Sequence, residues 1–212
     1  MTEKDKRPPQ VQSTVKDENL IAIRREQMIQ GAIKLFKEKG FHRATTREIA
    51  KAAGFSIGTL YEYIRTKEDV LYLVCDSIYH HAMERLSSYE IKAGTIDELK
   101  EMIREYFLQI DSMVDELTIM YQETKSLSKE AQRYVFSKEF EMVATFERLL
   151  QRCVQSGELT MTDKQIHLAA NNLVVSGQSW AFRKWALHRQ HSIDEFIDMQ
   201  ITLFISGIKG GF

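Results

Sequence analysis

Proline is confined to the beginning of this chain, at Pro8 and Pro9, and none follows in the rest of its 212 residues. Proline removes a backbone N–H and is excluded from helix interiors, whereas sheets and long loops usually contain it. The alternation of apolar and polar residues that marks a half-buried strand is also absent. The Thr/Ser-x-x-Glu pattern that caps a helix N-terminus occurs at residues 45–48, 95–98 and 192–195. The sequence therefore predicts an all-α fold.

Helix start and stop signals divide the chain into three predicted segments. Residues 1–18 are polar and contain both prolines, which indicates a flexible arm. Residues 19–68 are expected to form a three-helix head, and residues 69–212 a larger helical domain. About nine helices are expected: 21–39, 66–91, 95–113, 115–127, 128–157, 163–188 and 193–208, with two short ones between residues 45 and 64.

Charge is distributed unevenly along the chain. Residues 1–70 hold 14 Lys and Arg against 10 Asp and Glu, and the rest holds 15 against 20, so the net charge of −1 averages a basic and an acidic part. A mildly basic head on an acidic body suits a small nucleic-acid-binding module joined to a part that stays off nucleic acid. No apolar run reaches the roughly 18–20 residues that span a bilayer, and the N-terminus lacks a secretory pattern. We therefore expect a cytoplasmic protein with no membrane partner.

The stretch over residues 45–64 predicts two short helices separated by a tight turn at residues 54–56. The first helix can bury Ile49 and the second Leu60. Two helices of two turns each bury little area, so the helix over 21–39 must supply the third wall of their core. This arrangement is a helix-turn-helix, whose second helix enters the major groove of DNA.

Polar residues outside this predicted core have the chemistry of a DNA reader. Gly58 permits close approach of the backbone, and Thr59 is short enough to touch a base edge. Tyrosine hydroxyls can bond to phosphates, and helix N-termini favour anions. Thr45 and Ser56 would also cap helices without DNA, and Tyr61 could instead be a half-buried core ring. The candidate DNA-binding residues are Thr45, Arg47, Ser56, Gly58, Thr59, Tyr61, Tyr63 and Lys67.

Three motifs occur together within residues 22–71. They are I-x-x-A-I-x-L-F-x-x-x-G from Ile29 to Gly40, T-x-x-x-I-A-x-x-A-G-F-S-x-G-T-L-Y-x-Y from Thr45 to Tyr63, and T-K-E-D-V-L from Thr66 to Leu71. In these motifs the segment resembles the N-terminal domain of TetR/AcrR-type transcriptional regulators. Ile64 stands where that family usually has Phe, an apolar exchange that should repack without loss of the fold.

The resemblance implies a repressor that binds double-stranded operator DNA through the eight candidate residues. Helix-turn-helix proteins pair and read two half-sites about 34–36 Å apart. In regulators of this kind the last two helices form the pairing surface, which here implies a homodimer through residues 163–188 and 193–208. Both segments carry more apolar residues than one narrow stripe, as expected when one face meets the core and another meets a partner.

The predicted helices after residue 95 are rich in Met and aromatic residues, with polar residues interspersed. Such stripes are more often plain core than a cavity, but they also line adaptable apolar pockets. Buried polar residues among them need partners, either one another or the polar end of a ligand. We expect a small apolar or amphipathic effector, and an acyl thioester and an aromatic or drug-like compound both qualify. The candidate ligand-binding residues are Met102, Tyr106, Met113, Tyr121, Phe146, Asn172, Ser176, Trp180 and Arg183.

Other classes of protein find less support in the sequence. No H-E-x-x-H, G-x-S-x-G or phosphate-binding loop is present, so we expect no enzyme and no catalytic residue. Cys75 and Cys153 are too isolated to indicate a metal cage or a disulfide framework, and no cofactor is expected. A DNA binder indifferent to sequence would need a stronger positive balance than that of residues 1–70. The remaining alternative is a helical ligand-binding module whose head binds a protein rather than DNA.

Overall fold

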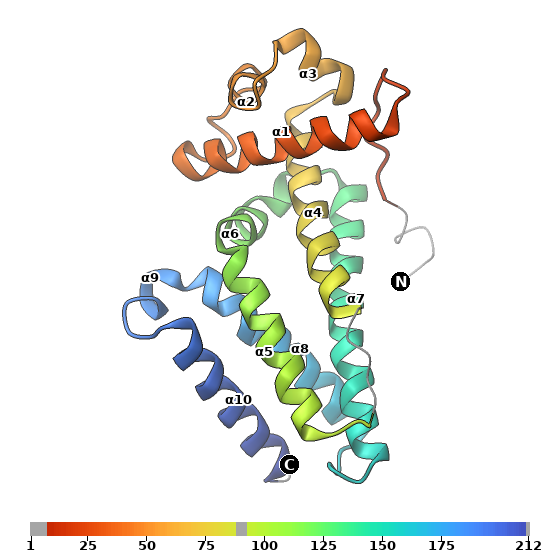
Figure 1. Cartoon of the computed structure of the whole chain (residues 1–212), viewed down its shortest axis with the longest axis vertical. Coiled ribbons are helices and arrows are strands. Elements are labelled where there is room, and N and C mark those ends of the chain that lie inside the picture. Colours follow the sequence, from red (N-terminus) through yellow and green to blue (C-terminus); the bar gives the residue numbers. More distant parts are fainter. Residues whose placement is uncertain (1–7, 88–92, 211–212) are drawn as a thin grey trace. The chain divides into compact units, whose positions relative to one another are not determined.

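The computed structural model describes the backbone of residues 8–87 and 93–210, and the side chains of the same residues except 82–87 (Figure 1). Ten α-helices and one 3-10 helix make up the described part of the chain, and no strand occurs in it. The predicted all-α fold is confirmed. The helices are α1 Glu18–Lys39, α2 Thr46–Ala52, α3 Ile57–Tyr63, α4 Lys67–Ser87, α5 Ile96–Ser112, α6 Val114–Glu123, α7 Lys129–Gln155, α8 Asp163–Phe182, α9 Lys184–Leu187 and α10 Ile193–Lys209, with the 3-10 turn at Thr124–Ser126.

The additional helix arises because the segment expected as one helix over 163–188 is broken. Arg183, with φ −113° and ψ 24°, leaves the helical conformation between α8 and the short α9. The ring of His188 then stacks on Trp180 with centroids 3.9 Å apart, and its Nε2 lies 3.0 Å from the Trp180 carbonyl oxygen. This stacking folds the chain back at a point where the sequence carries neither glycine nor proline.

The chain divides into two compact units, each built from two stretches of sequence. The first contains residues 1–79 and 115–137, and the second contains residues 80–114 and 138–212. This differs from the expected boundary after residue 68, because the first part of α4 packs within the first unit. Tyr72 of α4 lies there with its ring 5.8 Å from that of Tyr134.

Within the first unit, polar contacts also join α6 to α1 and to the loop that follows α1. Lys37 of α1 contacts Asp115 at 2.5 Å, and the ring of His42 lies 3.2 Å from a carboxylate oxygen of Glu123. One face of α1 forms the core of the head together with α2 and α3. The buried side chains of this core include Met28, Phe36, Ile49 and Leu60.

Residues 8–17 precede α1 and belong to the segment expected as a flexible arm. They are not helical, but they lie against the head: Thr14 N donates to Glu62 O of α3 over 2.9 Å. Asp17 caps α1 by accepting from Leu20 N, so this helix begins a few residues earlier than expected. Residues 1–7 of the expected arm lie outside the described residues.

The second unit is built around α5, which packs against α8 and α10. The buried side chains of α5 recur at helical spacing and include Leu99, Met102, Tyr106 and Ile110. Gly177 allows α8 to approach closely, because a Cβ at this position would lie 2.5 Å from Cε1 of Tyr106. Tyr106 also donates from its hydroxyl to the Val174 carbonyl over 3.0 Å.

None of the helices in the described residues is both long and apolar enough to cross a membrane.

Candidate DNA interface and ligand site

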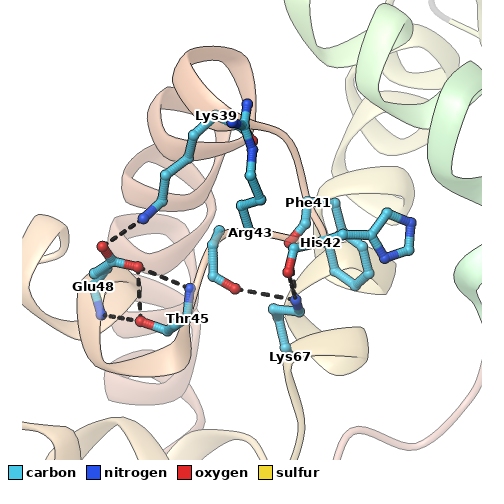
Figure 2. A network of polar contacts seen from close by, with 8 residues as sticks. Lys39, Phe41, His42, Arg43, Thr45, Glu48 and Lys67 are labelled. Carbon is cyan, nitrogen blue, oxygen red and sulfur yellow. Dashed lines mark hydrogen bonds and ion pairs between the residues drawn. The ribbon is translucent and has the colours of Figure 1, made fainter.

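The N-terminus of α2 is fixed by the predicted capping box. Thr45 Oγ1 accepts from Glu48 N at 3.3 Å, and Glu48 Oε2 accepts from Thr45 N at 3.0 Å (Figure 2). Lys39 at the end of α1 pairs with the other carboxylate oxygen of Glu48 at 2.5 Å. The hydrogen bond from Lys39, together with those from Thr45, lowers the pKa of Glu48 to about 2. The exposed Thr45 and Arg47 therefore lie at a rigid helix start.

Lys67 has a different role from the predicted phosphate contact. Its ammonium group donates to the carbonyls of Phe41, His42 and Ala44 over 2.9, 3.2 and 3.0 Å, and lies 4.3 Å from the centre of the Phe41 ring (Figure 2). An ammonium group has three donors, and all three are used here. Lys67 thus holds the loop between α1 and α2 from the start of α4, and its side chain does not face outward.

The turn between α2 and α3 has the predicted geometry. Gly54 adopts φ 78°, a conformation that side-chain-bearing residues rarely adopt, and Phe55 N donates to Ala50 O over 2.8 Å. Ser56 then caps α3 by accepting from Thr59 N over 3.0 Å. The two helices are thereby held as a helix-turn-helix.

The outer side of α3 presents the predicted reader residues. Gly58 is exposed, Thr59 is half-buried beside Ser56, and Tyr61 is 48% exposed. The Tyr61 hydroxyl lies 3.0 Å from the hydroxyl of Thr46 on α2, which links the two helices at their surface. Tyr61 is therefore a surface residue and not the half-buried core ring that the sequence left open.

Tyr63 does not belong to this surface. It is 3% exposed and lies on the same face of the helix as the buried Leu60. Residues three apart share a helix face, so the packing that buries Leu60 also buries Tyr63. The prediction that its hydroxyl contacts phosphate does not fit this position.

Four of the predicted ligand-binding residues belong to the core of the second unit. Met102, Tyr106, Phe146 and Trp180 are buried, and the rings of Tyr106 and Phe146 lie 5.3 Å apart with their planes at 68°. Met113 is also buried, with its sulfur 3.6 Å from Nε2 of Gln109. Burial raises the pKa of the Tyr106 hydroxyl well above its usual value. These side chains are uncharged and belong to the packed core of the second unit.

The other predicted ligand-binding residues lie elsewhere. Tyr121 is 66% exposed and belongs to the first unit. Asn172 is exposed on α8, and Arg183 is exposed with its guanidinium 5.4 Å from the centre of the Trp185 ring. Ser176 is half-buried and donates to Oε1 of Gln200 over 2.7 Å. Within the second unit, the exposed Asn172 and Arg183 and the half-buried Ser176 are thus not among the buried residues.

Two carboxylates that are not among the predicted site residues hydrogen-bond to buried side chains of α8. Asp111 accepts from the indole nitrogen of Trp180 over 2.6 Å, and Glu139 accepts from the buried Gln178 over 2.8 Å. Asp111 follows the apolar Ile110, whereas Glu139 follows the charged Lys138, and helical spacing alone does not separate either carboxylate from a solvated one. Their partners are about 40 to 70 residues away, which no local pattern reports.

Among the described residues, no group of three His, Cys, Asp or Glu side chains is arranged to hold a metal ion. Cys75 and Cys153 are buried and unpaired as thiols, and burial raises the pKa of Cys75 to about 12.

Comparison with known families identifies both parts of the chain. Residues 28–72 match the model of bacterial regulatory proteins of the tetR family, and residues 92–184 match the model of the tetracyclin repressor-like C-terminal domain. The chain belongs to the TetR family of transcriptional regulators. This TetR-family regulator accordingly combines a helix-turn-helix DNA-binding head with a C-terminal domain of the ligand-binding type, and its family consists of regulators rather than enzymes.

Individual relatives agree with this assignment. The regulator is 26% identical over 196 residues to the HTH-type transcriptional regulator HbdR of Aromatoleum sp. (strain CIB), covering 92% of this chain and 85% of the relative. A tetR-family regulatory protein from Rhodococcus RHA1 has the same fold, with a TM-score of 0.77 at 21% identity, covering 87% of this chain and 96% of that one. AibR in complex with isovaleryl coenzyme A and operator DNA superposes with a TM-score of 0.71 at 19% identity, covering 89% of this chain and 100% of that one.

Proposed function

We propose that this TetR-family regulator is a repressor that binds operator DNA as a homodimer and leaves it when a small apolar or amphipathic effector binds the second unit. One observation carries the proposal: the outer side of α3 presents Gly58, Thr59 and the exposed Tyr61 beside the capped N-terminus of α2. Such a surface has small side chains for close approach and hydroxyl groups for hydrogen bonds, and the core of the head lies behind it.

The DNA contacts follow from the positions of these residues. We place α3 in the major groove, with Gly58 allowing the backbone to approach and Thr59 reaching a base edge. The Tyr61 hydroxyl and Arg47 are in positions to bond to phosphates, and the first N–H groups of α2 favour the same anions. Thr45 and Ser56 contribute by holding the two helix starts.

The dimer would form through an apolar face on α8 and α10. Leu168 and Val175 on α8 are exposed, as are Met199 and Leu203 on α10. The hydrogen bond from Ser176 to Gln200 holds these two helices together in the second unit. A second copy that packs on this face would complete a four-helix arrangement and remove the exposed apolar side chains from water.

An acyl thioester is the effector class that the comparisons favour, because AibR, which shares the fold, binds isovaleryl coenzyme A. In this chain the buried cluster of Met102, Tyr106 and Phe146 would contact the apolar part of such a molecule. A ligand would replace contacts such as that between the rings of Tyr106 and Phe146, and its polar end would compete for the Glu139–Gln178 hydrogen bond. An aromatic or drug-like compound would fit the same cluster.

The test is a gel-shift titration of the purified protein with DNA from upstream of its own gene, against unrelated duplex at two salt concentrations. Thr59→Ala should weaken binding to the operator by about 1 kcal/mol or more, whereas Thr160→Ala, an exposed threonine of the second unit, should not. Arg47→Ala should weaken binding to every duplex and reduce the salt dependence by about one phosphate contact.

The proposal is contradicted if the protein binds both duplexes equally and if selection from random DNA yields no preferred sequence. That outcome would favour a head that binds protein. Acyl coenzyme A esters of graded chain length and free aromatic acids are then added to the complex. Release by only one of these series identifies the effector class, and release by neither contradicts both classes.

A further inference from the structure

Residues 11–15, which we call the strap, lie against the head without helical or strand structure and bend at Thr14. Their side chains alternate, half-buried at positions 11, 13 and 15 and exposed at positions 12 and 14. This alternation places one side of the strap against the protein. The strap ends two residues before Asp17, which caps α1.

Three donors of the strap share one acceptor, the carbonyl oxygen of Glu62 at the end of α3. Thr14 N donates to it over 2.9 Å, Ser13 Oγ over 2.8 Å and Thr14 Oγ1 over 3.3 Å. Carbonyls in the last turn of a helix have no partner within the helix. In α3 the Leu60 carbonyl is taken by Ile64 N, and the strap supplies the donors for Glu62.

Arg25 joins the strap to α1. Its Nη2 donates to the Val11 carbonyl over 2.6 Å and lies 3.5 Å from the carbonyl of Tyr63, the last residue of α3. Its Nε is buried without a hydrogen-bond partner, which is an energetic cost. The guanidinium of Arg25, held at this cost, links α1, the strap and the end of α3 and fixes their relative positions.

We propose that the strap holds α3 in the orientation that reads the operator, with Ser13, Thr14 and Arg25 as positioning residues that act through the helix. The inference rests on the proposed function, in which α3 is the recognition helix. A helix of two turns buries few side chains, so its own packing restricts its orientation only weakly. A tether at its end restricts that orientation further. The start of α2 is held by separate contacts from Thr45, Glu48 and Lys39.

The expected consequence is a loss of specificity rather than of DNA binding as a whole. Base contacts require α3 in one register, whereas phosphate contacts around α2 depend on its own capping box. Without the strap, affinity for the operator should fall while affinity for unrelated duplex stays the same.

The test uses full-length protein carrying Ser13→Ala and Thr14→Pro, which together remove all three donors to Glu62. Two controls accompany it: Thr14→Ala, which keeps the backbone N–H, and Gln12→Ala on the exposed side of the strap. Binding to operator and to unrelated duplex is measured by fluorescence anisotropy below the melting temperature. We expect the double variant to bind operator about tenfold more weakly, with both controls within about twofold of the parent and no change on unrelated duplex.

Hydrogen exchange provides a readout that does not depend on DNA. In the double variant the amides of α3 should exchange faster, while those of α2 keep their parent rates. If the parent protein binds no selected DNA, the proposed function fails, but this exchange result still decides whether the strap holds α3. Unchanged operator affinity, unchanged exchange in α3, or equal loss on both duplexes would overturn the proposal.

Discussion

The ammonium group of Lys67 is surrounded by three backbone carbonyls of the loop between α1 and α2. A charged donor makes a stronger hydrogen bond than a neutral donor does. A buried or half-buried carbonyl therefore loses more when a charged donor is removed. Lys67→Met should therefore lower the free energy of unfolding of the first unit by about 2 kcal/mol. The measurement is urea unfolding followed by circular dichroism.

Lys51→Met is the matched control, because Lys51 is exposed at the end of α2. It should change the free energy of unfolding by no more than about 0.5 kcal/mol. Both tryptophans, Trp180 and Trp185, lie in the second unit, so their fluorescence reports that unit separately. Equal stability of the two variants would mean that the three carbonyls do not need Lys67.

Glu48 makes the stability of the head depend on pH. Its pKa is about 2 in the folded protein, below the ordinary value of 4.5, because Lys39 and Thr45 bond to the carboxylate. A carboxylate whose pKa is lowered in the folded state stabilises the protein at pH values above its ordinary pKa. This stabilisation disappears as the pH falls toward 2. The melting temperature of the parent should therefore exceed that of Glu48→Gln at pH 7, with a difference that shrinks between pH 4.5 and 2.

Glu38→Gln, an exposed carboxylate near the end of α1, is the control for this series. It should show a smaller difference from the parent across the same range of pH. A difference between parent and Glu48→Gln that stays constant down to pH 2 would show that Glu48 acts through the shape of its side chain and not through its charge.

At the scale of the elements, the contact between α5 and α8 depends on the absence of a side chain at Gly177. A Cβ there would lie 2.5 Å from Tyr106 and 3.0 Å from Phe107, both of which are fully packed. Gly177→Ala should destabilise the second unit by about 1–3 kcal/mol, because one of the rings must leave its position. Urea unfolding followed by tryptophan fluorescence measures this change.

Gly207→Ala in α10 is the matched substitution without a clash, since no atom lies within 4 Å of a Cβ at that position. Alanine is favoured over glycine in a helix by up to about 1 kcal/mol, so this variant should be as stable as the parent or more stable. If both glycine variants were equally stable, the close approach of α8 to α5 would not be required.

At the scale of the whole molecule, the decisive quantity is the number of chains in the active species. Leu203 is 65% exposed in the middle of the apolar face proposed for dimerisation. Leu203→Glu would bury a charge in that interface, so we expect a monomer in light scattering coupled to size exclusion. Operator affinity should fall with it, because one head contacts only one half-site.

Ile23→Glu provides the control, because Ile23 is an exposed apolar residue on α1 in the other unit. It should leave the oligomeric state unchanged. A dimer that persists in Leu203→Glu would place the interface elsewhere, and a parent protein that is itself monomeric would contradict the proposed homodimer.

The sequence determined where three of the helices of this protein begin. The capping boxes at residues 45–48, 95–98 and 192–195 are all formed as predicted, because their hydrogen bonds join residues only three positions apart. The helix-turn-helix was equally visible, since Gly54 and the cap at Ser56 act on their immediate neighbours. Interactions between residues so close along the chain are encoded in the local sequence.

The tertiary structure alone decided which side chains these helices expose. Tyr61 and Tyr63 are two residues apart and chemically equivalent, yet only packing on the other helices buries Tyr63 and leaves Tyr61 at the surface. Lys67 finds its acceptors 23 to 26 residues away, and the strap finds Glu62 at a distance of 48 and 49 residues. Partners so distant depend on how whole helices pack, and the periodicity of a single helix does not specify that packing.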